Sequence, residues 1–397
     1  MATISPETTT AIHSDLKPSD LKPSCLKLLT INLCLHLPGA RNKYNVSLIA
    51  NSIKTLILAL LVSCVLVPQT WWLVWWIPAG LVLVIVTCQF FAMWWSLLLH
   101  FVLGKNYTEY KKERVHAFWE IVDKGAYDII ACQEMYGSWF WGSNSNKNRM
   151  LRNAKKRGYH FVKTGKPKLP AMLFDQGLCI FSKYPITDHA EKIYDAQTIW
   201  DKYFVNRAAL YAEITVDKNK PKIRVLTTHT SPSLKDMKER TKMAKILSEE
   251  GESTVSKQAG EMNILLLDKA KKSKEDTAIT VVMGDFNCEG GDDDYKYFER
   301  NFSASGLRDI TRNEDGTWTP TFAQVDEKGE PLETLLTVPG LLRKPQSLDF
   351  VFTDAEVIEG PIINRLVVEG KAVERGSDRT KIQQVSDHSG VEFSLSY

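Results

Sequence analysis

The longest hydrophobic segment of the chain spans residues 48–103, and Lys54 is its only formally charged side chain. Pro68 and Pro78 divide it into apolar stretches of 20 and 25 residues. Each is long enough to cross a hydrocarbon core as a helix, which needs about 20 residues. Four tryptophans lie between the two prolines, and indole rings favour the headgroup level of a bilayer. The pattern predicts an inserted hydrophobic helical hairpin, transmembrane or re-entrant; the alternative is a helical hairpin buried in a soluble core.

Basic residues flank this segment on both sides. Arg41 and Lys43 precede it, and Lys105 and Lys111 follow it. Positively charged flanks favour the cytoplasmic side of a membrane, so we expect both ends in the cytoplasm and an even number of crossings. The sequence thus predicts an integral membrane protein whose soluble part faces the cytoplasm. Glycosylation at any of the three Asn-X-Ser/Thr patterns would instead place that flank in the lumen.

Outside this segment, apolar positions recur with the periods of helices and strands. Residues 107–124 read as an amphipathic helix with a periodic apolar face. Further helices are expected at 146–157 and 239–270, the latter with a break near Gly251 or Gly260. Several apolar runs are nearly continuous, which is typical of strands covered by a second sheet. The predicted strands span residues 28–32, 127–133, 177–181, 208–216, 222–229, 278–283, 347–353, 362–368 and 391–396.

Composition narrows the class of protein. The net charge of +3 gives no overall sign of a polyanion-binding protein. Residues 147–168 nevertheless contain nine Lys or Arg and no acid, and we interpret this basic run either as a surface for anionic headgroups or as a solvated helix face. Seven cysteines without CxxC spacing argue against a structural zinc site and a disulfide framework, and are typical of a reducing compartment. Residues 1–23 are polar, so we expect a disordered tail without a cleavable signal peptide.

Polar side chains follow or begin several of the predicted strands. Because such positions meet when strands share a sheet edge, we expect these side chains to lie together. Asn, Asp and Glu provide the oxygen ligands that Mg²⁺ prefers, and histidines paired with carboxylates suit acid–base catalysis near neutral pH. The combination indicates metal-assisted hydrolysis of a phosphate ester. The candidate residues are Asn32, Glu134, His229, Asp285, Asn287, Asp349, Asp387 and His388.

Each candidate also has a purely structural interpretation. Residues 284–287 have the composition of a turn, as do Asp387 and His388. Asp349 is compatible with a buried salt bridge, and His229 with a hydrogen-bonded core histidine. Glu134 on its own could be a solvated loop acid. The case for catalysis therefore depends on all of these groups occurring together.

In their order along the chain, these groups resemble the endonuclease/exonuclease/phosphatase superfamily. The resemblance covers residues 24–36 and 115–397 and implies an α+β fold, a four-layer α/β/β/α sandwich of two packed mixed sheets. We therefore divide the chain into a tail (1–23), the first strand and metal-site segment (24–47), the inserted hairpin (48–103) and the remaining catalytic domain (104–397). The segments that carry the resemblance are Thr30-Ile31-Asn32, Cys132-Gln133-Glu134, Thr228-His229, Gly284-Asp285-Phe286-Asn287, Leu348-Asp349 and Ser386-Asp387-His388.

The resemblance implies a metal site. Glu134 is the expected direct ligand of Mg²⁺, for which Mn²⁺ is a possible substitute. Asn32 belongs to the same site, and Asp387 is the carboxylate that closes it. Mg²⁺ there would stabilise charge that grows on the phosphoryl oxygens.

The resemblance also implies catalytic roles. Asp285 orients or activates the attacking water, and Asn287 donates a hydrogen bond to the phosphate. His388 is the catalytic imidazole, whose tautomer Asp349 holds, and His229 assists the leaving oxygen. Arg207 is a further candidate for binding substrate phosphate; this inference rests on the arginine side chain itself and not on the resemblance.

Within the superfamily, residues 29–35, 128–136 and 177–186 are most similar to neutral sphingomyelinases. The chain departs from that pattern at Ser389-Gly390, at residues 230–232, and in the position of the apolar segment between the first two motifs. We therefore expect a membrane-anchored, Mg²⁺-dependent phosphodiesterase of phospholipase C type with its catalytic domain facing the cytoplasm. Its substrate would be sphingomyelin or a related phospholipid.

The expected partners are this lipid substrate and the bilayer itself, and no nucleic acid is expected. Two other functions are compatible with the same sequence. A membrane-tethered nuclease or inositol polyphosphate phosphatase would use the same site on a soluble polyanion. An inactive membrane scaffold would use the fold for binding alone, although every expected ligand is present.

Overall fold

The computed structural model describes a little over half of the chain. The predicted tail (1–23) and the predicted apolar hairpin (48–103) lie outside the described residues. Among the residues that are described, no helix is both long and apolar enough to span a membrane. The described ranges are 25–33, 111–137, 146–165, 175–198, 201–202, 205–232, 254–272, 277–323, 345–364, 372–375, 378–381 and 385–397.

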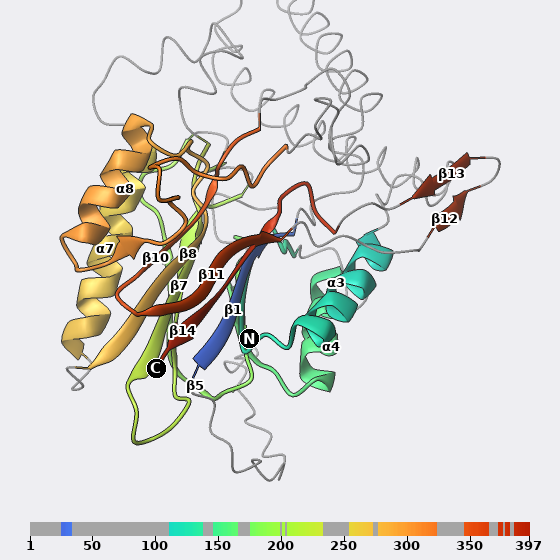
Figure 1. Cartoon of the computed structure of the whole chain (residues 1–397), viewed down its shortest axis with the longest axis horizontal. Coiled ribbons are helices and arrows are strands. Elements are labelled where there is room, and N and C mark those ends of the chain that lie inside the picture. Colours follow the sequence, from blue (N-terminus) through green and yellow to red (C-terminus); the bar gives the residue numbers. More distant parts are fainter. Residues whose placement is uncertain are drawn as a thin grey trace, which may run out of the picture.

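Two six-stranded mixed sheets form the centre of the molecule (Figure 1). The first has the order β11-β14-β1-β2-β4-β3. Its strands are β1 (Cys25–Asn32), β2 (Ile129–Gln133), β3 (His160–Lys163), β4 (Cys179–Ser182), β11 (Val357–Asn364) and β14 (Gly390–Ser396). The second has the order β5-β6-β7-β8-β10-β9. Its strands are β5 (Ile186–Ile193), β6 (Ala208–Ile214), β7 (Lys222–His229), β8 (Ala278–Asp285), β9 (Arg308–Asp309) and β10 (Asp349–Thr353). A separate hairpin joins β12 (Ala372–Arg375) to β13 (Asp378–Lys381).

Alternation along the strands places one set of side chains between the sheets and another beneath helices. In β6, Leu210 and Ile214 point into the core between the sheets, whereas Tyr211 joins the core under α7 and α8. In β1, Leu28 faces the core between the sheets and Leu29 faces α3 and α4. This two-sided burial follows from the period of two in a strand, and it explains why the strands read as continuous apolar runs.

Helices cover both outer faces of the two sheets (Figure 1). α3 (Lys111–Gly125) and α4 (Asn146–Lys156) pack on the first sheet, and α7 (Thr254–Lys272) and α8 (Asp293–Ser303) pack on the second. In α3, Val115, Phe118, Trp119 and Val122 are buried against the sheet, as the helical period predicts. The four layers confirm the predicted α/β/β/α sandwich.

Several elements differ from the sequence prediction. α8 and the edge strands β3, β5 and β9 were not predicted. α7 continues through Gly260 without a break, and the predicted helix before residue 254 lies outside the described residues. β11 begins at Val357, before the predicted strand at 362–368. Gly360 and Pro361 interrupt its pattern, and an edge strand tolerates them because one of its sides needs no ladder bonds.

A buried hydrogen bond connects the two sheets. Gln133, at the end of β2, donates through Nε2 to Thr30 Oγ1 of the same sheet at 3.0 Å and to Thr227 Oγ1 of the opposite sheet at 2.8 Å. All three side chains are fully buried. Loss of one acceptor would leave a buried amide donor unsatisfied, which costs about 1–3 kcal/mol.

We expect Thr227→Val, an isosteric change, to lower the free energy of unfolding by about 1–2 kcal/mol because it removes this acceptor. Urea unfolding of the full chain measures the difference. Thr187→Val is the matched control, since Thr187 is exposed on β5, where the same change should cost less than about 0.5 kcal/mol. Equal stability of the Thr227 variant and the wild type would contradict a structural role for the bridge.

Candidate active site

The site lies where the central parallel strand pair of each sheet ends. β1 and β2 are parallel in the first sheet, and β7 and β8 are parallel in the second. Strands β1, β7 and β8 end at Asn32, His229 and Asp285, and Glu134 directly follows β2. Because the sheets pack face to face, these ends meet: Asn32 Nδ2 donates to Asp285 Oδ2 at 2.9 Å. The structure therefore brings the first four sequence candidates into one place.

Unusual backbone conformations shape this edge. Glu134 and Asn287 are non-glycine residues with positive φ, +54° and +48°. Such conformations are unfavourable for side-chain-bearing residues and are common at functional sites. Gly284 has φ +151°, and a Cβ there would lie 2.2 Å from the carbonyl oxygen of Thr228. Only glycine therefore allows β8 to approach β7 at this point.

His229 lies among carboxylates and an arginine. Its Nε2 is 3.5 Å from Asp285 Oδ2 and 3.8 Å from Glu134 Oε1. Arg207 Nη1 lies 2.7 Å from the same Nε2. Because a guanidinium can only donate, Nε2 accepts this bond and the ring proton sits on Nδ1. Nδ1 faces the hydroxyl of Tyr136 at 3.4 Å.

Arg207 lies beside His229, and its contacts are with protein groups; its binding of substrate phosphate stays a prediction. Its Nε donates to Asp201 Oδ1 at 2.8 Å, and Nη1 is the donor to His229. Tyr136 was not predicted as a site residue. The only sequence signal was its position two residues after Glu134, which placed it near the same edge.

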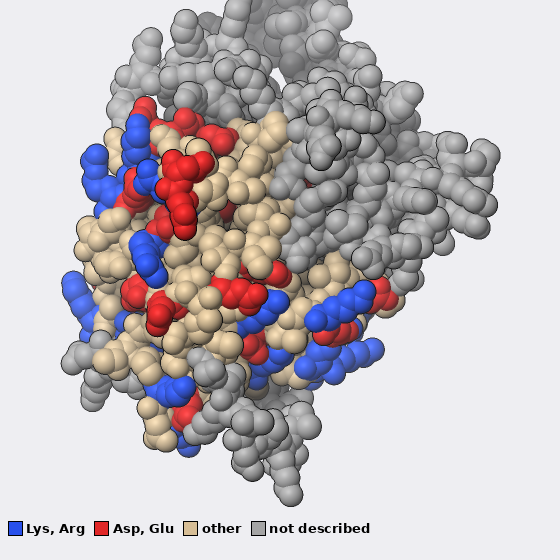
Figure 2. All heavy atoms as spheres, in the orientation of Figure 1, with Lys and Arg blue, Asp and Glu red and all other residues tan. Residues whose placement is uncertain are grey.

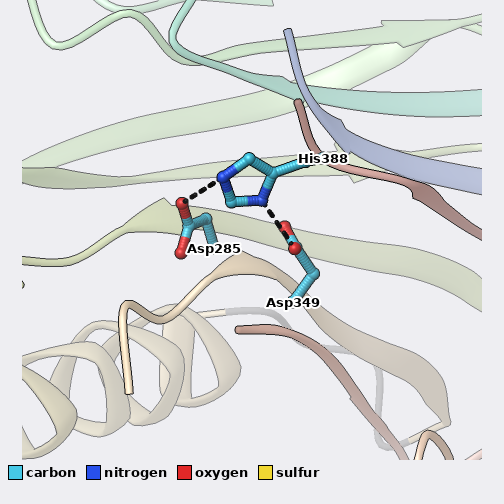
Figure 3. A group of neighbouring side chains, drawn as sticks. All are labelled: Asp285, Asp349 and His388. Carbon is cyan, nitrogen blue, oxygen red and sulfur yellow. Dashed lines mark hydrogen bonds and ion pairs between the residues drawn. The ribbon is translucent and has the colours of Figure 1, made fainter. Parts of the chain in front are cut away.

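His388 and Asp349 form a buried pair that crosses from one sheet to the other (Figure 3). His388 precedes β14 and donates through Nδ1 to Asp349 Oδ2, at the start of β10, at 2.9 Å. Asp349 lies opposite Asp285 in the β8–β10 register. His388 Nε2 consequently points toward Asp285 Oδ2 at 3.9 Å. This arrangement leaves Nε2 of the imidazole facing the shared site.

The electrostatics of the pair are strongly perturbed. Burial alone would lower the pKa of His388, but Asp349, followed by Asp285 and Asp387, outweighs that effect and raises the pKa to about 10. Burial raises the pKa of Asp285 to about 7; His388 and the hydrogen bond from Asn32 oppose the rise, while Asp349 adds to it. In the absence of a cation, a charged Asp285 is therefore unfavourable at this position.

The remaining candidates lie at the border of the site. Asn287 donates its backbone N–H to Asp285 Oδ1 at 2.8 Å and its side-chain amide to the Thr230 carbonyl at 2.8 Å. Asp387 is buried. The preceding Ser386 donates through Oγ to the backbone carbonyl of Asn32. Asp387 is thereby attached to the end of β1, beside the other predicted metal ligands.

The chemistry of these side chains fits a hard divalent cation. Four carboxylates are buried around the site, those of Glu134, Asp285, Asp349 and Asp387. Buried charges are costly unless they are paired or bind a metal. Asn32 adds an amide oxygen as a further ligand for Mg²⁺. Burial raises the pKa of Asp285, so a cation bound beside it would favour its charged form.

A second arrangement could also hold a cation. The ligand atoms of Asp285, Asp349 and His388 lie within 4.8 Å of one another. His388 Nδ1 and Asp349 Oδ2 already share a hydrogen bond there. Because Mg²⁺ prefers oxygen to imidazole nitrogen, the oxygen-rich side near Asn32 and Glu134 is the better match.

Within the described residues, 147–165, the basic run does not converge on this site. Lys147 is buried and paired with Asp175 at 2.6 Å. Tyr159, just after α4, donates to the Tyr127 carbonyl, which precedes β2. The end of α4 that carries Lys155 therefore lies at the opposite end of the sheet from the site. On the face of the molecule that Figure 2 shows, basic and acidic side chains are interspersed, and basic ones lie over α3 and α4.

Comparisons with known folds identify the architecture. SmcL superimposes with a TM-score of 0.55 at 15% identity, covering 94% of this chain and 100% of that one. A β toxin structure from Staphylococcus aureus gives 0.52 at 16% identity, covering 93% and 99%. A mutant of that toxin with bound magnesium ions gives 0.51 at 16% identity, covering 94% and 99%. At such low identity these similarities concern the fold.

Sequence comparison shows the family. No curated protein sequence is significantly similar to the chain. Residues 98–388, however, match the model of the Endonuclease/Exonuclease/phosphatase family. This match covers most of the chain and includes all but the first of the site residues, and the fold agrees with it. The chain therefore belongs to the endonuclease/exonuclease/phosphatase family.

Proposed function

We propose that this protein is a membrane-anchored, Mg²⁺-dependent phosphodiesterase of phospholipase C type. Its substrate is sphingomyelin or a related phospholipid in a cytoplasmic leaflet, from which it releases the phosphorylated headgroup. The observation that carries the proposal is the convergence of Asn32, Glu134 and Asp285 with two histidines in one buried acidic site. Magnesium bound to a β toxin structure of the same fold supports the choice of cation.

The position of the apolar segment supports a lipid substrate. The described chain stops at Leu33, next to Asn32, and resumes at Lys111 in α3. Arg114 Nη2 donates to the Leu33 carbonyl at 2.7 Å, so both ends of the interval lie at the catalytic edge. An apolar segment of 56 residues attached there is expected to hold the site close to a bilayer surface.

In the proposed reaction, water attacks phosphorus and the bond from phosphorus to the lipid oxygen breaks. Asp285 and His388 Nε2, 3.9 Å apart, orient the water, and Asp285, whose pKa burial raises to about 7, accepts its proton. Asp349 keeps the proton of His388 on Nδ1. Mg²⁺ held by Glu134, with Asn32 and Asp387, would stabilise negative charge on the phosphoryl oxygens.

The leaving oxygen needs a proton from the other side of the site. In this proposal Arg207 turns from His229 to the substrate phosphate, together with Asn287, when substrate binds. His229 Nε2, 3.5 Å from Asp285 Oδ2, then takes the proton that Asp285 accepted from the water and passes it to the leaving alkoxide, which departs as the lipid alcohol. The products are that alcohol and the phosphorylated headgroup.

The alternative function, on a soluble polyanion, is less well supported. A nuclease needs cations along its substrate's phosphates, whereas Lys147 is consumed by an ion pair and the exposed part of α4 lies away from the site. Rates on sphingomyelin vesicles, plasmid DNA and inositol polyphosphates, each with Mg²⁺, discriminate the functions. Hydrolysis of either soluble substrate well above that of the vesicles would overturn the lipid assignment.

Release of phosphocholine from sphingomyelin vesicles should require Mg²⁺, stop with a chelator and resume when Mg²⁺ is restored. We expect Glu134→Gln to reduce the rate at least about 100-fold, because a neutral amide is a poorer ligand than a carboxylate. Glu299→Gln is the control, since Glu299 lies on the outer helix α8 in a partly exposed ion pair with Arg312 and should leave the rate unchanged. A Glu134 variant with wild-type activity would refute the metal assignment.

The His388–Asp349 pair should also be visible in titrations. Without metal, we expect NMR to place the pKa of His388 near 10. In Asp349→Asn the pKa should fall by several units, toward or below the ordinary value of about 6.5, because burial then dominates. The same variant should lose about 100-fold or more in kcat. An unchanged pKa in this variant would contradict the pairing.

The sign of the accompanying stability change follows from the raised pKa. The folded state holds the His388 proton more tightly than the unfolded chain does. The pair therefore stabilises the metal-free protein fully below about pH 6.5, and this contribution is lost as the pH rises toward about 10. Urea unfolding at several pH values measures it, and Asp349→Asn should flatten the dependence.

A further inference from the structure

Arg114 is a buried arginine outside the catalytic groups. It lies in the first turn of α3, and its side chain is almost fully buried. Among the described residues no carboxylate forms an ion pair with it, and its Nη1 is buried without a hydrogen-bond partner. Burial of an unpaired charge is unfavourable. Packing alone therefore does not account for an arginine at this position.

The guanidinium of Arg114 bridges two segments that carry predicted metal ligands. Nη2 donates to the carbonyl of Leu33 at 2.7 Å, and Nε donates to the carbonyl of Val385 at 2.5 Å. Leu33 directly follows Asn32, and Val385 lies two residues before Asp387. A planar fork with several donors suits such a double contact.

These contacts begin where the β-ladder ends. The antiparallel pairing of β1 with β14 stops at Thr30 and Val391. Beyond that point, ladder bonds between these two strands no longer set the distance between Asn32 and the segment before β14. Ser386 Oγ donates to the Asn32 carbonyl and accepts from the backbone N–H of His388. Beyond the last ladder bond, Ser386 and Arg114 therefore hold the end of β1 to the segment before β14.

The helix that carries Arg114 is itself firmly seated. Val115, Phe118 and Trp119 are buried in the core between α3 and the first sheet. On the other side of the contact, Leu33 N–H donates to the Gln133 carbonyl at 3.0 Å, immediately before Glu134. Arg114 thus connects a fixed helix directly to the segments that bear Asn32 and Asp387, and through Leu33 to the segment that bears Glu134.

We propose that Arg114 is a positioning residue of the cation site, holding Asn32 and Asp387 at the spacing that a divalent cation requires. It touches neither substrate nor cation and acts through the two carbonyls. This inference rests on the proposed function only in taking that site as the metal site. The identity of the lipid does not enter it.

The test is the affinity of the full-length protein for Mn²⁺, measured by electron paramagnetic resonance of the free ion. Arg114→Met removes both donors at similar length, and we expect its affinity to fall about 10- to 100-fold, as for other groups that support metal ligands. Arg114→Lys keeps the charge but lacks the fork. Its affinity should lie between those of Arg114→Met and the wild type, which separates positioning from a pure charge effect.

Arg157→Met is the matched control. Arg157 pairs with Asp123 and lies over the ring of Trp119, on the outer helical layer. This variant should bind Mn²⁺ as the wild type does, even if its unfolding temperature falls. When the rate of hydrolysis is titrated with Mg²⁺, the Mg²⁺ concentration at half-maximal rate should rise at least about 10-fold in the Arg114 variants. Their kcat at saturating Mg²⁺ should stay within a few-fold of the wild type. Loss of structure would instead lower kcat at every Mg²⁺ concentration.

Two outcomes separate this inference from the proposed function. If Arg114→Met and Arg114→Lys fold and bind Mn²⁺ as tightly as the wild type, Arg114 is not a positioning residue, whatever the substrate. If only Arg114→Lys folds, its Mn²⁺ affinity alone is compared with that of the wild type, and an equal affinity rules out a positioning role. If the wild type binds Mn²⁺, the variants bind it less tightly and no lipid is hydrolysed, the role of Arg114 is supported and the proposed substrate is wrong.

Discussion

The cost of burying four carboxylates is the constraint around which this structure is arranged. Glu134, Asp285, Asp349 and Asp387 are all withdrawn from water, and each would be costly there as an isolated anion. Two of these carboxylates accept hydrogen bonds from neighbouring side chains: Asp285 from the amide of Asn32 and Asp349 from the imidazole of His388. The raised pKa of Asp285 shows that this compensation is incomplete. An acidic site of this kind is prepared for a divalent cation.

The two-sheet architecture makes such a site possible. A strand pair that ends within one sheet can present only neighbouring side chains along a single edge. Here each sheet contributes a parallel pair with its ends on the same side, so groups from both sheets face one another. Gln133 and Thr227 fix the sheets against each other just below, and Gly284 allows β8 to approach β7 closely. Rigid strands, rather than loops, therefore set most distances in the site.

Much of this arrangement could be predicted from the sequence. Central strands were recognisable because both faces are buried, and the polar residues that follow them stood out. β5 escaped detection because its residues are mostly exposed or half-buried at a sheet edge. α8 begins with acidic residues, and its buried Tyr295, Phe298 and Phe302 form only a short apolar face.

Tertiary partners were beyond the reach of local patterns. Tyr136 and Arg114 make contacts with residues distant in the chain. The local sequence indicated no role for Arg114, and for Tyr136 it indicated only proximity to Glu134. For the basic run, the local pattern instead suggested a shared surface that the described residues do not form. Its charges are adjacent in sequence, yet Lys147 turns inward to Asp175 while Arg157 pairs with Asp123 at another place. Charge counted along a chain is a poor guide to the field at a particular site.

The antiparallel pairing of β1 with β14 has a consequence for biosynthesis. Asn32 and Ser386 are joined by a hydrogen bond although 354 positions separate them. A nascent chain exposes β1 early, but the imidazole and carboxylate beside β14 leave the ribosome only much later. Contacts so distant in sequence also form slowly. If the apolar segment enters a bilayer during translation, as the proposed function requires, the chain is already anchored before its catalytic centre can form.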